Sequence, residues 1–254
     1  MLDKKNKQYI FSVISFLIIL VSWWVASLTL MPHLGIIPSP VETFRIIGEE
    51  IRKDNFFPAV FSTLYTSFVS FLVAFLLGIF LAIVASFKTS IGIILSPIIA
   101  IFRAMPTMGV VLILLIIVGG QTPIFVALLI IFPMCYENMR AAIAETNPQL
   151  IKMAKVFKVP KWRQITSIYL PGMSPLIFSS IIAGFGLNIK VVISAEIMGF
   201  PSMSIGHLML AARQGFNFDI MFAWLVIAVI LSLICEGILR IIARLCMPFN
   251  KSPL

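Results

Sequence analysis

Residues 58–87 read PAVFSTLYTSFVSFLVAFLLGIFLAIVASF and contain no charged side chain. An α-helix that crosses the hydrocarbon core of a membrane needs about 20 mostly apolar residues, and this stretch has 30 residues. Ala74, Gly78 and Ala82 recur every four residues along it, so they share one face of a helix. Small residues at this spacing let membrane helices approach each other closely. The stretch therefore predicts a membrane-spanning helix that packs tightly against a neighbour.

The composition of the whole chain supports the same conclusion. Of its 254 residues, 60% are hydrophobic and only 11% are charged, and the mean hydropathy is +1.08. A soluble domain averages roughly 45–50% apolar and about 25% charged residues. A soluble fold of this size could not bury so much apolar surface, because its surface stays large relative to its core. We therefore predict an all-α membrane protein.

Five further apolar runs raise the prediction to six transmembrane helices. The first run follows three lysines, as in a signal peptide, but it exceeds the roughly 7–15 apolar residues of such a peptide and no small-residue cleavage site follows it. The third run is interrupted by Pro97, Arg103 and Pro106 and predicts one kinked or broken crossing. A surface helix is expected at 41–51 and a loop at 195–219. The predicted crossings are 9–31, 58–87, 91–119, 124–144, 172–194 and 220–242.

The distribution of positive charge orients these helices. Lys and Arg collect in the cytoplasmic loops of membrane proteins. With six crossings, 13 of the 19 Lys and Arg residues lie on the side of the two termini and four lie on the other side, which predicts that both termini are cytoplasmic. The predicted parts are a cytoplasmic N-terminus (1–8), one transmembrane domain (9–247, core about 58–247, cytoplasmic loop about 145–171) and a cytoplasmic tail (248–254).

The cytoplasmic loop contains a dense basic segment, residues 150–171, which reads LIKMAKVFKVPKWRQITSIYLP and holds five cations and no acid. Asn147-Pro148 predicts a helix start, with Asn as the cap and Pro at the first helical position. Val159-Pro160 predicts the end of that helix. A second short helix is expected at 161–169, ending at Leu170-Pro171 and leading into the fifth crossing.

The first of these two short helices has one apolar face, because its apolar residues occupy positions i, i+3, i+4 and i+7 while its lysines lie toward the other side. Two interpretations are open from the spacing alone. The helix could lie on anionic lipid headgroups with its cations toward them. Alternatively, its apolar face could fill a groove on a soluble partner. The residues of the face are Leu150, Met153, Ala154 and Phe157.

This segment resembles the cytoplasmic loop of the permeases of binding-protein-dependent ABC importers. The loop of that family has Glu-Ala-Ala, three residues, Gly, nine residues and then Ile-x-Leu-Pro. The ending matches residues 168–171, whereas 152–154 (Lys-Met-Ala) hold the Glu-Ala-Ala positions and Lys158 holds the Gly position. In the family the Gly allows a turn between two short helices. A left-handed Lys costs roughly 1 kcal/mol, so we expect a differently shaped turn here, set by Pro160.

The resemblance extends from about residue 30 to about residue 245. GIIPSP (35–40), FRAMPTMGVVLILLIIVGG (102–120) and NIKVVISAEIMG (188–199) are similar, in order and spacing, to segments of the nitrate, sulfonate and taurine branch. It implies a type I ABC importer permease (MetI-like) fold in a bacterial cell membrane. It also implies a homodimer or a pair with a close paralogue, two cytoplasmic ATPase subunits and an extracytoplasmic solute-binding protein. The solute would be nitrate, a sulfonate, taurine or a thiamine precursor. The residues implied to couple to the ATPase are Leu150, Met153, Ala154, Phe157, Lys158, Val159, Pro160, Leu170 and Pro171.

Four residues in or beside the apolar runs are candidates for the solute pathway or its gate. A charge within the membrane is costly, so such a residue should face protein, water or a partner. Arg103 and Pro106 lie in the broken third run, and Lys190 and Glu196 lie in and after the fifth. The alternatives are that Arg103 snorkels to an interface and that Lys190 and Glu196 are structural anchors.

No enzyme chemistry is predicted for this chain. It has no Gly-rich loop ending in Gly-Lys-Ser/Thr and no cluster of metal-ligating residues, so ATP and Mg²⁺ are assigned to the partner ATPase. Its basic loops also lack the motifs of nucleic-acid-binding modules. An ion-coupled secondary transporter is the alternative function, but it predicts inverted repeats that are not evident. A membrane enzyme of lipid metabolism would need clustered Asp or His at a membrane face, which the sequence lacks.

Overall fold

The residues described by the computed structural model are 2–29, 37–146, 148–199 and 203–246. Every regular element within these ranges is a helix, which confirms the predicted all-α class. Three predictions concern residues outside these ranges: the end of the first crossing at Met31, the cap at Asn147 and the tail 248–254.

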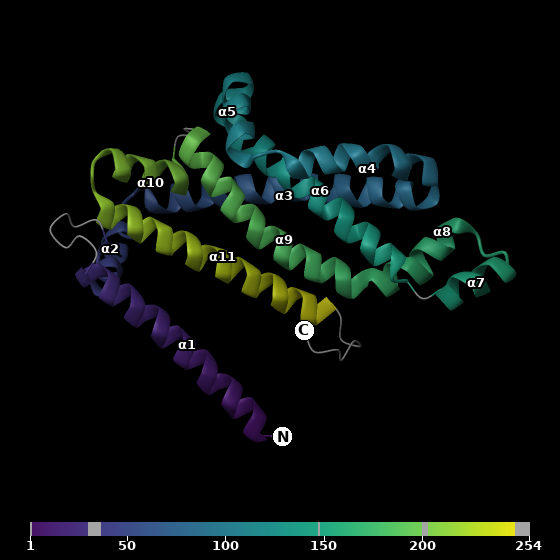
Figure 1. Ribbon diagram of the computed structural model, residues 1–254, viewed down its shortest axis with the longest axis horizontal. Helices are drawn as coiled ribbons and strands as arrows, with labels where there is room; N and C mark the ends of the chain where they lie inside the picture. Colours follow the sequence, from purple (N-terminus) through teal and green to yellow (C-terminus); the bar gives the residue numbers. More distant parts are fainter. Residues whose placement is uncertain (1, 30–36, 147, 200–202, 247–254) are drawn as a thin grey trace.

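Most helices are long and apolar, and Figure 1 shows an elongated bundle with α7 and α8 at one end and α2 and α10 toward the other, while α1 leans away from the bundle beyond α2. The α-helices are α1 (Leu2–Thr29), α2 (Pro40–Glu50), α3 (Phe56–Phe87), α4 (Thr89–Ala104), α5 (Thr107–Val118), α6 (Thr122–Ala144), α7 (Pro148–Val156), α8 (Lys161–Gln164), α9 (Leu170–Gly199), α10 (Ile205–Gln214) and α11 (Phe218–Cys246).

Four helical segments are long and apolar enough to cross a membrane. They are Phe56–Phe87, Thr107–Ala144, Lys161–Gly199 and Phe218–Cys246. Two shorter apolar helices, Val13–Thr29 and Thr89–Ala104, accompany them. Each of the six predicted runs is therefore helical where it is described, apart from a break at Met105 and Pro106 in the third run, while six complete crossings remain a prediction.

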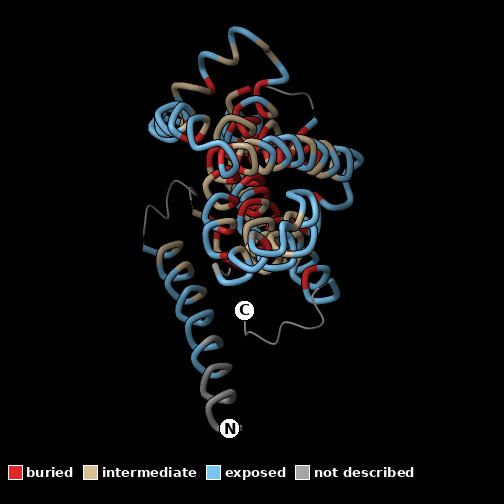
Figure 2. The backbone as a smooth tube through the Cα atoms, turned by 90° about the vertical axis from the view of Figure 1, so that its right-hand side faces the viewer, coloured by how far each residue is buried: buried red, intermediate tan, exposed pale blue. Residues whose placement is uncertain are grey.

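The centre of the bundle is formed by α3, α6 and α9, and Figure 2 shows buried backbone concentrated there. The stripe of small residues in α3 faces this centre, since Ala74 and Ala82 are fully buried and Gly78 is buried as well. A Cβ atom added to Gly78 would lie 2.7 Å from Cys135 Cβ and 2.9 Å from the backbone nitrogen of Tyr136. The close helix neighbour predicted from the sequence is thus confirmed, and it is α6.

We expect Gly78→Val to destabilise the protein by about 1–3 kcal/mol, because added methyl groups would force α3 and α6 apart. Leu76→Val is the matched control, since Leu76 lies on the same helix and is 58% exposed. Thermal unfolding in mild detergent measures the effect as a lower midpoint for Gly78→Val. Equal midpoints for the two variants would contradict the close α3–α6 contact.

The third apolar run is broken, as its prolines predicted. Helix α4 ends at Ala104 and α5 begins at Thr107, with Met105 and Pro106 extended between them. The two helices point in different directions in Figure 1. Pro97, in contrast, lies inside α4 without ending it.

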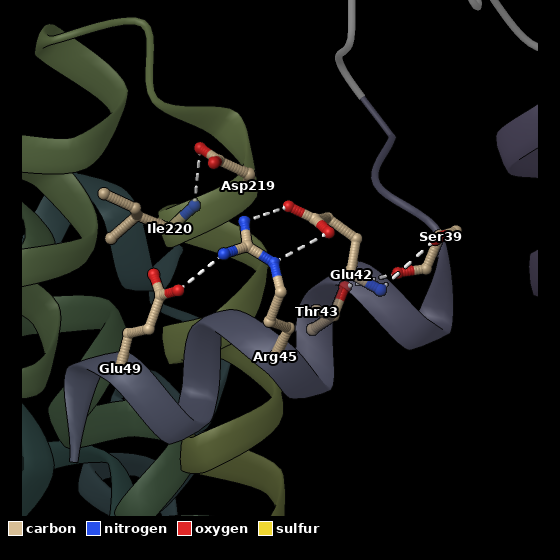
Figure 3. A network of polar contacts seen from close by, with 7 residues as sticks. All are labelled: Ser39, Glu42, Thr43, Arg45, Glu49, Asp219 and Ile220. Carbon is tan, nitrogen blue, oxygen red and sulfur yellow. Dashed lines mark hydrogen bonds and ion pairs between the residues drawn. The ribbon is translucent and has the colours of Figure 1, made fainter.

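The surface helix expected at 41–51 is present as α2. Ser39 caps it by accepting a hydrogen bond from the Glu42 backbone N–H, and Pro40 occupies its first turn. Figure 3 shows Arg45 reaching both Glu42 and Glu49 along the exposed side of this helix. The hydrogen bond from Arg45 lowers the pKa of the Glu42 carboxyl below its usual value, because it stabilises the ionised form.

The prediction of a loop at 195–219 is wrong. Helix α9 continues to Gly199, and a further helix, α10, occupies Ile205–Gln214. Ser204 caps α10 by accepting from the His207 backbone N–H. The polar residues of this region therefore serve as helix caps and buried contacts, which made the segment look loop-like in sequence.

Candidate functional site

The basic segment that was predicted to be cytoplasmic folds into α7, a tight turn and α8. Helix α7 ends with two backbone hydrogen bonds, from Phe157 N to Met153 O (3.0 Å) and from Val159 N to Ala154 O (2.9 Å). Lys158 lies between them with φ of 50°, in the left-handed region. The bond from Val159 N to Ala154 O, closed around a left-handed residue, is the six-residue bond of a Schellman motif, the usual helix ending that places Gly at the left-handed position. The prediction that Pro160 would give this turn a different shape is therefore wrong. Lys158 adopts the left-handed conformation at the position where the family has Gly.

We expect Lys158→Gly to stabilise the protein by about 1 kcal/mol, because Gly adopts a positive φ without the contact between Cβ and the backbone that Lys suffers. The measurement is the midpoint of thermal unfolding of the purified protein. Lys152→Gly is the control, because it places Gly inside α7 and should lower stability by about 1 kcal/mol. A decrease in the midpoint for Lys158→Gly would contradict the strained turn.

The apolar residues of α7 and the following turn are exposed. Leu150 is 45% exposed, Met153 54% and Phe157 72%, whereas Ala154 is 3% exposed and turns inward. Val156, at 77%, was not among the sequence candidates and extends the same apolar surface. Trp162 on α8 is 73% exposed. We call this set of exposed side chains the apolar knob; its members are Leu150, Met153, Val156, Phe157 and Trp162.

The prediction that the second short helix ends at Leu170-Pro171 is wrong. Helix α8 continues through a π-helical turn, Ile165–Tyr169, into α9, so that Lys161–Gly199 forms one helical run. In the π turn the Leu170 N–H bonds to Ile165 O, five residues back. Pro171 lacks an N–H and would disturb an ordinary helix. The wider turn absorbs this disturbance and joins α8 directly to a long apolar helix.

The segment is held against the end of α3 by aromatic contacts. The Phe87 ring lies 6.0 Å from the Tyr169 ring in an edge-on arrangement, and Lys161 Nζ lies 5.9 Å from the Phe87 ring centre. The Gln164 side chain donates to the Val159 carbonyl at 2.7 Å and fixes the turn to α8. These contacts tie α8 and the π turn to the end of α3.

Among the four candidates for the pathway, Arg103 forms an ion pair with Glu137 of α6 at 2.5 Å. The side chains of this pair are 59% and 44% exposed. Pro106 is exposed at the break between α4 and α5. Lys190 is exposed on α9 and lines a hollow with Ser232 and Glu236 of α11. A role of these residues in a solute pathway remains a prediction.

Glu196, the fourth candidate, is only 1% exposed. Its carboxylate accepts from Thr63 Oγ1 of α3 (2.9 Å) and from the Gly206 backbone N–H of α10 (3.2 Å). The Thr63 hydroxyl in turn accepts from the Ile205 backbone N–H (3.1 Å). A Cβ on Gly206 would lie 2.4 Å from Glu196 Cβ and 2.7 Å from the Ile193 carbonyl oxygen, so the start of α10 packs directly against α9 beside Glu196. Glu196 thus joins α3, α9 and α10.

Several buried polar contacts between helices were not predicted from the sequence. The Asn188 side chain donates to the Ser67 carbonyl at 2.8 Å and joins α9 to α3. Glu50 accepts from Trp224 Nε1 at 3.2 Å and joins α2 to α11. A lone amide in an apolar run was a usable signal for Asn188, because buried polar groups need partners. Nothing local in the sequence distinguishes Glu50 from the exposed acids beside it.

A family model matches most of this helical arrangement, including the turn between α7 and α8. Residues 74–246 match the family described as "Binding-protein-dependent transport system inner membrane component". The chain belongs to this family. It is a multi-pass inner-membrane permease, the non-catalytic component of a binding-protein-dependent ABC importer. The family predicted from the cytoplasmic loop is confirmed.

Curated relatives cover most of the permease. The putative aliphatic sulfonates transport permease protein SsuC of Bacillus subtilis is 24% identical over 220 residues, 85% of this chain and 79% of its own length. The taurine transport system permease protein TauC of Escherichia coli is 23% identical over 256 residues, 96% of this chain and 91% of its own length. A probable ABC transporter permease protein of Haemophilus influenzae is 30% identical over 158 residues, 60% of this chain and 62% of its own length.

Solved structures show the same fold at low identity. A chain of the inward-facing MetNI methionine ABC transporter matches with a TM-score of 0.63 and 19% identity, covering 73% of this permease and 93% of that chain. A chain of a bacterial ABC transporter involved in the import of the acidic polysaccharide alginate matches with a TM-score of 0.64 and 19% identity. The match covers 94% of this permease and 97% of that chain. The likeness establishes that the permease has the fold of MetI-type importer subunits.

Proposed function

We propose that this permease forms the solute pathway as a homodimer, or together with a close paralogue, and that the apolar knob couples it to cytoplasmic ATPase subunits. In this arrangement six helices cross the membrane and both termini are cytoplasmic. The excess of Lys and Arg on the side of α7 and α8 supports this orientation. The end that carries α2 and α10 then faces outward.

The observation that carries the proposal is the exposed apolar surface on a basic cytoplasmic segment. Four side chains of the apolar knob (Met153, Val156, Phe157 and Trp162) are each more than half exposed. Large apolar side chains grouped in this way mark a protein contact site. A helix that presents an apolar face to a groove on a partner is a recurring mode of recognition. The ATPases would supply that groove, together with ATP and Mg²⁺.

The mechanism follows from the connections of the segment. ATP binding would bring the two ATPases together and pull on the apolar knob of each permease. Because α8 is continuous with α9 and Phe87 ties the segment to α3, the pull would tilt these helices and switch the pathway from inward to outward access. An extracytoplasmic binding protein would deliver solute at that moment.

The relatives suggest the class of solute. SsuC and TauC are described as permeases for aliphatic sulfonates and for taurine. We infer a small solute of the sulfonate and taurine type, with the final choice made by the binding protein.

Copurification from mild detergent tests the proposed assembly. We expect an ABC ATPase to copurify with the tagged full-length permease and to hydrolyse ATP faster when the cognate binding protein and its solute are added. A permease that purifies without an ATPase, and whose addition to the candidate ATPase leaves hydrolysis unchanged, would contradict the proposal.

A further inference from the structure

A second polar region lies on the bundle itself, between α4 and α6. On α4, Ser96, Ala100 and Arg103 occupy positions i, i+4 and i+7 and therefore share one face. On α6, Glu137 and Arg140 lie three residues apart and also share a face. The Arg103–Glu137 ion pair shows that these two polar faces meet.

The two faces enclose a groove. A cavity of about 300 Å³ lies between the helices and is lined by Ser96, Ile99, Tyr136, Glu137 and Arg140. A second hollow of about 590 Å³ shares Ser96 and Arg140 with it and extends to the end of α3. Binding cavities for small molecules typically begin at about 300 Å³. The space is therefore sufficient for a small organic solute.

This groove is unsuited to lipid. Charged side chains within membrane-spanning segments almost always face a bundle interior or a water-filled cavity, because lipid cannot solvate them. Arg103 and Glu137 are nevertheless well exposed on the isolated permease. The opposite side of α4 is apolar, with Ile94 and Ile101 more than half exposed. The polar side thus fits an aqueous pathway, and the apolar side fits lipid or protein.

The charges of the groove do not cancel. Arg103 is neutralised by Glu137. Arg140 donates to the Tyr136 hydroxyl at 3.4 Å but forms no ion pair with any residue in the described ranges. Its position four residues before the end of α6 places it roughly 6 Å inside the helix end. One guanidinium is therefore left to attract an anion, and guanidinium groups bind oxyanions through two parallel hydrogen bonds.

We propose that the groove between α4 and α6 is the solute-binding part of the pathway and takes small organic anions whose sulfonate or carboxylate head group is held by Arg140. This inference rests on the proposed function as a permease and names the chemistry of its solute. The hydroxyl groups of Tyr136 and Ser96 line the same cavity and can donate to the remaining head-group oxygens. The Arg103–Glu137 pair holds the two helices together beside the bound solute.

Charged thiol reagents test the inference without knowledge of the natural solute. The full-length permease with Ser96→Cys is reconstituted in phosphatidylcholine vesicles and treated at low salt with anionic sulfonatoethyl methanethiosulfonate or its cationic trimethylammonioethyl counterpart. Mass spectrometry follows position 96, and each rate is divided by the rate with free cysteine. We expect the anionic reagent to react at least about tenfold faster, because of the unpaired charge of Arg140.

The controls separate charge, access and lipid. The preference should disappear with Arg140→Gln, persist with Arg140→Lys, and be absent at Ile94→Cys, which lies on the apolar side of α4. Equal rates at position 96, a preference for the cation, or a preference that survives Arg140→Gln would overturn the inference. A preference that disappears when phosphatidylglycerol is added would also overturn it, by identifying the occupant as a lipid headgroup. Because the assay contains no ATPase, failure of the proposed coupling leaves its outcome unchanged.

Discussion

Phe157→Asp is expected to abolish copurification of the ATPase while leaving membrane insertion of the permease intact. Phe157 is 72% exposed and belongs to the apolar knob. Burying a phenyl group contributes about 1.5–3 kcal/mol, and placing a carboxylate in the same apolar groove adds a further penalty. Together these effects should weaken association at least about a thousandfold. The measurement is the amount of ATPase retained by the tagged permease in mild detergent.

The matched control is Phe216→Asp. Phe216 is 79% exposed and follows α10 at the opposite end of the bundle, so the same chemical change is made at the end that the proposed topology places outside. This variant should retain the ATPase at the wild-type level. Normal assembly of Phe157→Asp would contradict the docking interpretation and favour the alternative in which α7 rests on anionic lipid.

Glu196→Leu is expected to detach α10 from the bundle and to lower the stability of the permease by about 2–4 kcal/mol. The substitution leaves the Thr63 hydroxyl and the Gly206 N–H buried without their acceptor, and each unmet buried group costs about 1–3 kcal/mol. Hydrogen exchange should show faster exchange of the α10 amides. The ATPase should still copurify, because the apolar knob lies at the other end of the molecule.

Glu49→Leu provides the comparison for this variant. Its side chain is 56% exposed on α2, near the same end of the bundle, and pairs only with the exposed Arg45 among the described residues. Exposed pairs of this kind contribute about 1 kcal/mol or less. Exchange of the α10 amides in Glu196→Leu at the rate seen in Glu49→Leu would show that Glu196 does not anchor the helix.

Hydrophobic length and helical periodicity carried most of the fold prediction. The run at 58–87 became α3, and its small residues pack against α6, because a helix of this composition has few alternatives in lipid. The prolines near Arg103 correctly predicted a broken helix. The spacing also predicted the apolar residues of α7, three of which (Leu150, Met153 and Phe157) are exposed, while their role in docking stays a prediction.

Three features were not predicted, two because of backbone hydrogen bonds at helix ends and one because of a contact distant in the sequence. Lys158 was expected to avoid the left-handed turn, but two backbone hydrogen bonds at the end of α7 hold it there and outweigh its strain. Helix α10 was missed because its start is held by Glu196 and Thr63, and Thr63 lies 142 residues before Ile205. Pro171 was expected to end a helix, yet the π turn before it lets the helix continue. Local propensity does not encode any of these.

Uptake into vesicles tests the central claim, that this permease imports solute at the expense of ATP, most directly. The permease, its ATPase and the binding protein are reconstituted, and a radiolabelled alkanesulfonate is supplied with the binding protein. Uptake should require ATP on the ATPase side and should continue when ionophores collapse all ion gradients. Uptake that survives removal of ATP but stops when the ion gradient is collapsed would contradict it and identify an ion-coupled transporter.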